Sequence, residues 1–325
     1  MNGCERIRAA LRGTQPDRVP VMLHNFLTAA REAGISQRRF REDPAAIAES
    51  FIRAVESYEY DGILVDVDTV TLAEVLGVKV DKPEDQPARW AGPAIDSLSA
   101  AQDLPPIDVG SHPRIQVWLD AVRRIKAHFR NEIFVRGNCD QAAFSLASMV
   151  RGPVDWMMDL TDEKNHADAR ALLSYCTEAA GAFIRLMAET GADMISNGDS
   201  PAGPDLVSPA FYRAFAQPYE RRLVEEAHSR GLPYTLHICG DTTRILDAML
   251  ETGASTLPNH SRSPLATSQL STSPAGVPMK ARTPAASSVT ALTARPGVAV
   301  AAPLLQLCEL GGRVRRGPGR RSAAR

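Results

Sequence analysis

The sequence predicts an α/β fold built on a parallel sheet, and within that class it favours a (β/α)8 barrel. Short apolar runs alternate with amphipathic stretches through the first 254 residues, and repeated strand–helix units form parallel sheets with right-handed crossovers. An open doubly wound sheet also fits this alternation. No Gly-x-Gly-x-x-Gly follows the first predicted strand, which weakens a dinucleotide-binding interpretation.

Polar residues follow the predicted strands at their C-terminal ends, and this clustering favours the barrel. A (β/α)8 barrel assembles its active site from that end of its strands. The residues concerned are His24 and Asn25, Asp66 and Asp68, Asn138 and Asp140, Asn197 and Asp199, and His237 and Cys239.

The first elements have clear boundary signals. Residues 18–24 are the first apolar run and predict a strand. Asp43 as N-cap, with proline at the next position, then opens a helix that runs towards Tyr58. Two further apolar runs, at residues 62–68 and 133–137, predict the second and third strands.

The middle of the chain continues the alternation. Apolar residues recur at helical spacing between residues 169 and 190, which predicts a helix with one buried face. Gly191 is placed to end that helix. Residues 193–197 follow as the fourth strand.

The last predicted unit ends near Gly253. Ser208 and its following proline repeat the cap-then-proline pattern and open a helix that we expect to bend or break at Pro218. Residues 233–239 are the fifth strand, and a further helix then runs to Gly253.

His237 and Cys239 at the end of the fifth strand are the most informative pair in the chain. Side chains alternate along a strand, so these two project from the same face. An imidazole and a thiol side by side are half of a soft metal site. A buried cysteine with a hydrogen-bonded histidine beside it is the alternative interpretation.

Composition limits the class of protein. No apolar stretch is long enough to cross a bilayer, and the first residues lack the apolar core of a signal peptide. The cysteines are five in number and scattered, which is not typical of a disulfide framework. We expect a cytoplasmic protein with reduced thiols and no membrane association.

Residues 255–325 differ in composition from residues 1–254. They contain ten Lys or Arg residues, one acidic residue and no aromatic residue. Such a segment is expected to be disordered, or to result from a reading-frame shift near residues 253–254. A basic segment can also bind nucleic acid, but the lack of aromatic residues argues against that role. We therefore predict a domain at 1–254 and a basic tail at 255–325.

Several stretches resemble the uroporphyrinogen decarboxylase superfamily, and more closely its zinc-dependent, corrinoid-linked methyltransferase branch. They are Pro16-Asp-Arg-Val-Pro20, Tyr60-Asp-Gly-Ile63 through Leu76-Gly77, Gly198-Asp-Ser-Pro201 with Ser208-Pro209, and Leu236-His-Ile-Cys-Gly240. The resemblance covers about residues 5–254 and implies the (β/α)8 barrel of that superfamily.

The methyltransferase branch implies a zinc site. The resemblance places two Zn²⁺ ligands at His237 and Cys239, and a third is expected from a late Gly-Cys turn that has no counterpart here. Cys308 lies in an apolar run and is a weak candidate. The implied reaction moves a methyl group between a corrinoid, free or on a partner protein, and a small-molecule thiol.

The decarboxylase branch, which acts in porphyrin biosynthesis on a tetrapyrrole substrate, is the alternative. Asp68 falls near the essential aspartate of that branch, but residues 25–30 lack its carboxylate-binding arginines. Asp199 is a further candidate, either to orient a ligand or to cap a helix. A non-catalytic binding protein is the third interpretation.

Five strands before Gly253 are too few to close a barrel of eight. We therefore expect a barrel that is incomplete on its C-terminal side. Because two ligands are also fewer than the three that catalytic zinc sites usually have, we expect this chain to be impaired or inactive.

Overall fold

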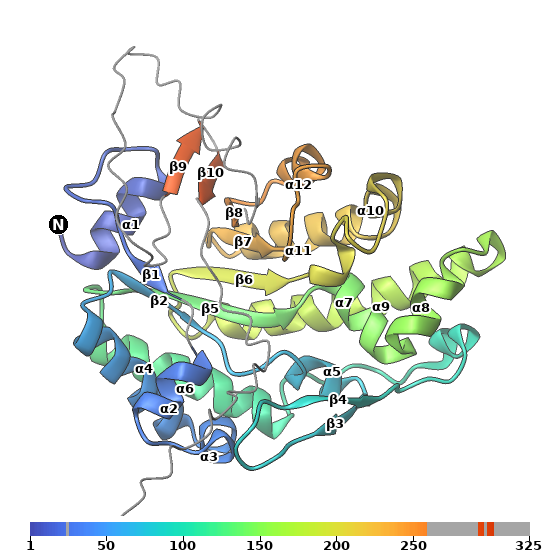
Figure 1. Ribbon diagram of the computed structural model, residues 1–325, viewed down its shortest axis with the longest axis horizontal. Coiled ribbons are helices and arrows are strands. Elements are labelled where there is room, and N and C mark those ends of the chain that lie inside the picture. The colour runs from blue at the N-terminus through green and yellow to red at the C-terminus, as the bar shows by residue number, and fades with distance from the viewer. Residues whose placement is uncertain (24–25, 259–291, 296–297, 302–325) are drawn as a thin grey trace, which may run out of the picture.

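The computed structural model describes residues 1–23, 26–258, 292–295 and 298–301, and it has the predicted α/β architecture (Figure 1). The five predicted strands form one parallel sheet in chain order. They are β1 (Met22–Leu23), β2 (Gly62–Val65), β5 (Phe134–Gln141), β6 (Met194–Gly198) and β7 (Tyr234–His237). His24 and Asn25, predicted to follow the first strand, lie outside the described residues.

The sheet continues beyond β7 with three short strands. They are β8 (Thr256–Pro258), β9 (Leu292–Arg295) and β10 (Val298–Ala301). β8 pairs in parallel with β7, and β10 pairs in parallel with β8 and antiparallel with β9. Within the described ranges the order ends at β9, without a pairing that returns to β1, so this sheet is open.

These three strands lie within residues 255–325, the segment predicted from its composition to be a basic tail. The division at residues 254/255 stays a prediction, because most of that segment, with Cys308 and the arginines from residue 313 onwards, lies outside the described residues. No helix in the described part of the chain is long and apolar enough to span a lipid bilayer.

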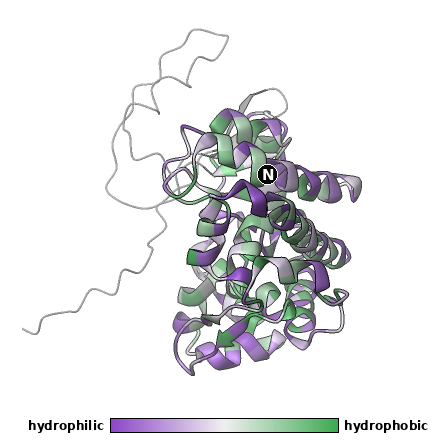
Figure 2. Ribbon diagram, turned by 90° about the vertical axis from the view of Figure 1, so that its right-hand side faces the viewer, coloured by the Kyte–Doolittle hydropathy of each residue, from purple (hydrophilic) through white to green (hydrophobic). Residues whose placement is uncertain are grey.

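Amphipathic helices cover the outer face of the sheet. The largest contact one another in the order α4 (Pro44–Tyr58), α6 (Pro113–Phe129), α9 (His166–Ala188) and α11 (Gln217–Ser229). Figure 2 shows hydrophilic and hydrophobic residues on the same helices. The apolar stripe predicted for residues 169–190 is buried on α9, with Leu172, Cys176 and Phe183 fully enclosed, as helix packing requires.

The remaining elements connect these layers. They are α1 (Gly3–Leu11), α2 (Phe26–Glu32), α3 (Gln37–Glu42), α5 (Thr71–Val75), α7 (Ala143–Arg151), α8 (Pro153–Asp159), α10 (Pro209–Phe215) and α12 (Leu246–Glu251), the hairpin β3 (Lys79–Asp81) and β4 (Arg89–Gly92), and the 3₁₀ turns η1 (Leu98–Asp103), η2 (Glu163–Asn165) and η3 (Ser200–Ala202).

The predicted helix boundaries are largely confirmed. The Asp43 side chain accepts a hydrogen bond from Ala45 N at 2.9 Å and caps α4. Ser208 accepts from Phe211 N at 3.2 Å and caps α10. The helix expected to break at Pro218 does so at Ala216, which separates α10 from α11, because proline is tolerated only in the first turn of a helix.

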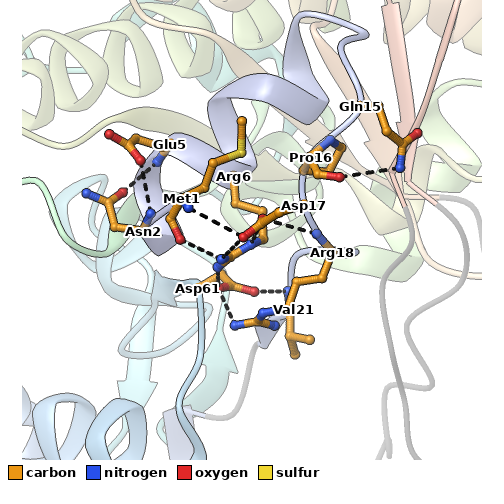
Figure 3. A network of polar contacts seen from close by, with 10 residues as sticks. All are labelled: Met1, Asn2, Glu5, Arg6, Gln15, Pro16, Asp17, Arg18, Val21 and Asp61. Carbon is orange, nitrogen blue, oxygen red and sulfur yellow. Dashed lines mark hydrogen bonds and ion pairs between the residues drawn. The ribbon is translucent and has the colours of Figure 1, made fainter.

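Charged residues close the N-terminal end of the sheet, where α1 lies against β2 and β5. Asp61 is 2% exposed. It pairs with Arg6, accepts from Arg18 Nη2 at 2.8 Å, and accepts from Val21 N at 2.7 Å (Figure 3). One buried carboxylate thereby joins α1, the segment entering β1, and the start of β2.

A second buried carboxylate, that of Asp193, makes similar contacts at the same end of the sheet. Asp193 accepts from Arg8 Nη2 at 2.8 Å, from Lys126 Nζ at 2.7 Å, and from Val135 N at 2.9 Å. It therefore ties α1 to α6 and to the β5–β6 pair. The face opposite the C-terminal strand ends supports stability in barrels of this type.

We expect Asp61→Ala to lower the free energy of unfolding by about 3–5 kcal/mol, because it removes a buried carboxylate that pairs with both Arg6 and Arg18 and leaves Nη1 of the buried Arg6 guanidinium without this acceptor. Urea unfolding followed by circular dichroism measures this loss. Asp17→Ala is the matched control, since Asp17 also pairs with Arg6 but has a side chain that is 48% exposed, and we expect a much smaller effect. Equal losses in the two variants would contradict this account.

Candidate functional site

His237 and Cys239 meet at the C-terminal end of β7, as their spacing predicts. His237 is the last residue of the strand, and its Nε2 lies 3.2 Å from Cys239 Sγ. The intervening Ile238 points to the opposite side and is fully buried. The imidazole is half-buried and the thiol is exposed, so both are accessible at the C-terminal end of β7.

The geometry of this pair fits two ligands of a zinc ion. Zn–N and Zn–S bonds at a tetrahedral angle place their donor atoms about 3.5 Å apart, close to the 3.2 Å observed between His237 Nε2 and Cys239 Sγ. Within the described residues, no group of three or more His, Cys, Asp and Glu side chains is arranged to hold a metal ion. The described residues therefore supply two donors, and a third donor is not among them.

The turn that follows β6 holds the end of β7 in place. Asp199 N donates to His237 O at 2.8 Å, and Cys239 N donates to Ser200 Oγ at 3.2 Å. Gly203 permits this close approach, because a Cβ there would lie 3.1 Å from Ile238 Cγ2 and 3.4 Å from Cys239 O. Two backbone hydrogen bonds thus fix the segment that carries the imidazole and the thiol.

Asp199, a predicted catalytic residue, is fully buried. Its Oδ1 accepts from both the backbone N and the Oγ of Ser145, each at 2.7 Å. Ser145 lies in the first turn of α7, so Asp199 caps a helix distant in sequence rather than the helix that it precedes. Burial raises the pKa of Asp199 to about 6, against the lowering effect of these hydrogen bonds.

Glu220 of α11 is the second buried carboxyl group here, and the sequence offered no signal for it. It is fully buried, and its Oε2 accepts from Tyr212 Oη at 2.5 Å. Burial and the nearby Asp199 raise the pKa of Glu220 well above its ordinary value. The charge of Asp199 therefore disfavours ionisation of Glu220.

Asp68, the other predicted catalytic residue, has both oxygens engaged. Its Oδ1 accepts from Val70 N at 3.0 Å, and from Thr71 N at 2.9 Å and Thr71 Oγ1 at 2.8 Å, which caps α5. Its Oδ2 pairs with Arg114, which also contacts Glu74 at 2.7 Å. At 2% exposure, this carboxylate stabilises the helix that follows β2.

Asp140 lies beside Asp68 at the first turn of α5. It has a left-handed backbone, with φ of 60°, at an irregularity in the β5–β6 pairing. Its Oδ2 accepts from Leu72 N at 2.7 Å, whereas its buried Oδ1 has no hydrogen-bond partner among the described residues. Strained backbone and bulges concentrate at functional sites, but the sequence marked this residue only by its place at a strand end.

Arg136 of β5 is a second charged residue that the sequence did not single out. Its Nε is buried without a hydrogen-bond partner among the described residues. Burial lowers the pKa of Arg136 to about 10, and the negative charge of Asp66 partly offsets that lowering. It therefore places a cation in the sheet interior near the polar strand ends.

Two further cysteines of the described residues are part of the core. Cys176 is fully buried on α9, as predicted for a core residue, and Cys139 on β5 is equally buried. Burial raises the pKa of both thiols, which disfavours the thiolate that a metal or an electrophile requires. Cys239 is thus the accessible thiol of the described residues.

Asp140 should make stability depend on pH. Burial and the charge of Asp68 raise its pKa well above the ordinary value, so the folded chain holds this proton more tightly than the unfolded chain. Protonated Asp140 therefore contributes fully to the stability of the fold below about pH 4. This contribution falls as pH rises towards the pKa of Asp140 in the folded chain. We therefore expect the stability of Asp140→Asn relative to wild type to increase progressively as pH rises above about 4.

Urea unfolding of both chains at several pH values tests this expectation. Asp120→Asn is the control for the loss of one negative charge, since the Asp120 side chain is 40% exposed and pairs with Arg124 one helical turn away. A difference between wild type and Asp140→Asn that does not change with pH would show that Asp140 is not protonated in the fold.

Known proteins match this chain over most of its length. A methylcobamide:CoM methyltransferase MtbA of Methanosarcina mazei is 28% identical over 261 residues, which cover 78% of this chain and 74% of that protein. A uroporphyrinogen decarboxylase of Nocardia farcinica is also 28% identical, over 265 residues that cover 76% and 70% of the two chains. Both activities thus occur among its relatives.

Solved structures support the fold. A methyltransferase from Methanosarcina mazei superposes with a TM-score of 0.70 at 22% identity, over 79% of this chain and 75% of that chain. The family model described as uroporphyrinogen decarboxylase (URO-D) matches residues 3–278. With this match and the parallel α/β sheet, the chain belongs to the uroporphyrinogen decarboxylase (URO-D) family.

Proposed function

We propose that this protein transfers a methyl group between a corrinoid and a small thiol at the C-terminal end of β7. The observation that carries the proposal is the approach of His237 Nε2 to Cys239 Sγ at 3.2 Å on an accessible strand end. Neighbouring imidazole and thiolate donors bind soft metal ions such as Zn²⁺. The methylcobamide:CoM methyltransferases among the relatives support a corrinoid as the methyl carrier.

Each residue of the site has a role in this proposal. His237 and Cys239 would hold Zn²⁺, with Cys239 as the thiolate and His237 as the neutral imidazole. When bound, zinc lowers the pKa of a substrate thiol and makes the nucleophilic thiolate available near neutral pH. Asp199 and Ser200 hold the backbone of this segment through the hydrogen bonds to His237 O and from Cys239 N.

Decarboxylation of a tetrapyrrole is the second candidate, supported by the uroporphyrinogen decarboxylases among the relatives. It would need Asp68 to bind the pyrrole N–H groups. Both oxygens of Asp68 are instead taken up by the first turn of α5 and by Arg114. Asp68 would have to exchange those partners for substrate, so methyl transfer has the better structural support.

Because the described residues supply two donors, we expect wild-type protein to bind zinc weakly, at less than one ion per chain, and His237→Ala and Cys239→Ser to lose most of it. Elemental analysis after dialysis gives the metal content. Methyl transfer from methylcobalamin to 2-mercaptoethanol, followed by the cobalamin absorption spectrum, should fall with the zinc content because both depend on the same two side chains.

Cys176→Ala is the matched control, since it removes a fully buried thiol that we expect to leave zinc content unchanged. Zinc that persists in both His237→Ala and Cys239→Ser would refute the site. Metal-independent conversion of uroporphyrinogen, abolished by Asp68→Asn, would favour the decarboxylase. A folded chain that fails both assays would be a non-catalytic binding protein.

A further inference from the structure

The two faces of the sheet differ in character, and Phe134 of β5 shows which of them is the inner face. It forms a cluster with Cys4 and Ile7 of α1 that is separate from the main core between the sheet and its helices. Phe134 therefore points away from those helices. Because side chains alternate along a strand, Arg136 and Asn138 point to the same inner face as Phe134.

Strand pairing carries this inner face across β6 and β7. Asn138 pairs with Ser196 of β6, and Ser196 pairs with Thr235 of β7. The Thr235 hydroxyl in turn contacts the sulfur of Met194 at 3.1 Å, and Met194 belongs to the same cluster as Phe134. The inner face is therefore apolar at its base, at this cluster, and carries polar residues from there towards the strand ends.

Several polar groups of the inner face satisfy one another. Ser196 Oγ donates to Asn138 Oδ1 at 3.2 Å. The hydroxyl oxygens of Thr235 and Thr256 lie 2.5 Å apart. Arg136 is not satisfied in this way. Its Nε is enclosed without a hydrogen-bond partner, and among the residues that the structure describes no carboxylate forms an ion pair with its guanidinium.

An unpaired cation inside a fold needs an explanation. A buried charge loses its hydration, and this costs free energy unless an opposite charge or hydrogen bonds replace the water. Asp66, just beyond β2, attracts the guanidinium of Arg136 through space. Arg136 as a whole keeps partial exposure, so room remains beside its side chain. Groups that a protein retains against its own stability commonly belong to functional sites.

We propose that this inner face binds the carboxylate of a small organic acid, and that Arg136 is the cation that receives it. A guanidinium donates two parallel hydrogen bonds to a carboxylate, which fits its planar shape. One positive charge with the negative charge of Asp66 nearby suits a monoanion better than a phosphate dianion. The ligand supplies the missing partner of Arg136 without a metal or a methyl carrier, so this site goes beyond the function proposed above and does not depend on it.

Two pairs of probes separate charge from shape: acetate with acetamide, and benzoate with benzamide. The members of each pair have nearly the same size, and only the acid is charged. Saturation-transfer NMR of the chelator-treated, dialysed full chain at constant ionic strength reports their binding without zinc. We expect the acid of at least one pair to bind, and its amide to bind at least about tenfold more weakly. Equal binding of acid and amide, or no binding of either acid, would overturn the proposal.

Arg136→Gln removes the cation and keeps a polar side chain. We expect it to weaken binding of the acid about 10- to 100-fold. Arg136→Lys should retain part of the affinity, because an ammonium group keeps the charge but not the two parallel hydrogen bonds. Arg124→Gln is the matched control with unchanged affinity, since it removes the same charge from a side chain of α6 that is 51% exposed. Wild-type affinity in Arg136→Gln would show that Arg136 does not bind the acid.

Urea unfolding gives a second readout. A ligand that binds only the folded chain raises the unfolding midpoint. The acid should therefore raise it in wild type and in Arg124→Gln, relative to the same concentration of sodium chloride, and not in Arg136→Gln. The same rise in Arg136→Gln would place the acid elsewhere and refute the site. If circular dichroism shows that Arg136→Gln does not fold, unchanged affinity in Arg136→Lys would contradict the proposal instead.

Discussion

The parallel pairing of β5, β6 and β7 is the constraint on which the candidate site depends. Gln141 pairs with Gly198, and Gly198 pairs with His237, so three strand ends reach the same level of the sheet. Only this register places the turn after β6 beside the end of β7. The hydrogen bonds to His237 O and from Cys239 N then follow from the alignment of the strands, and a slip of one residue would turn both His237 and Cys239 to the opposite face of the sheet.

Four buried carboxyl groups near these strand ends are accommodated in different ways. Asp68 is paired with an amide of α5 and with the guanidinium of Arg114. Asp199 accepts two hydrogen bonds from Ser145, and Glu220 accepts one from Tyr212, while burial and the charge of Asp199 raise the pKa of Glu220. Asp140 has one partner and a raised pKa. Each arrangement avoids an unpaired buried charge. Together they allow carboxyl side chains near the strand ends to be buried in the core.

Local signals in the sequence predicted the strands and several helix ends, and they placed His237 beside Cys239. These features depend on neighbours in the chain: a cap residue, a proline, or the alternation of a strand. The exposed hairpin of β3 and β4 has no such apolar pattern and was missed. The partners of Asp199 were also beyond prediction, because Ser145 lies 54 residues away, and Glu220 on an otherwise polar helix had no distinguishing neighbour.

The ion pair between Arg8 and Asp193 has a consequence for how the chain is made. The two residues are 185 positions apart. At a synthesis rate of about 5–20 residues per second, roughly 10–40 s pass between the emergence of α1 and that of its partner. Until β2 and β5 have been synthesised, the apolar face of α1, with Cys4 and Ile7, has no strand pair to cover. The contacts of α1 are complete only after Asp193 has followed, and its apolar face needs protection from aggregation in the meantime.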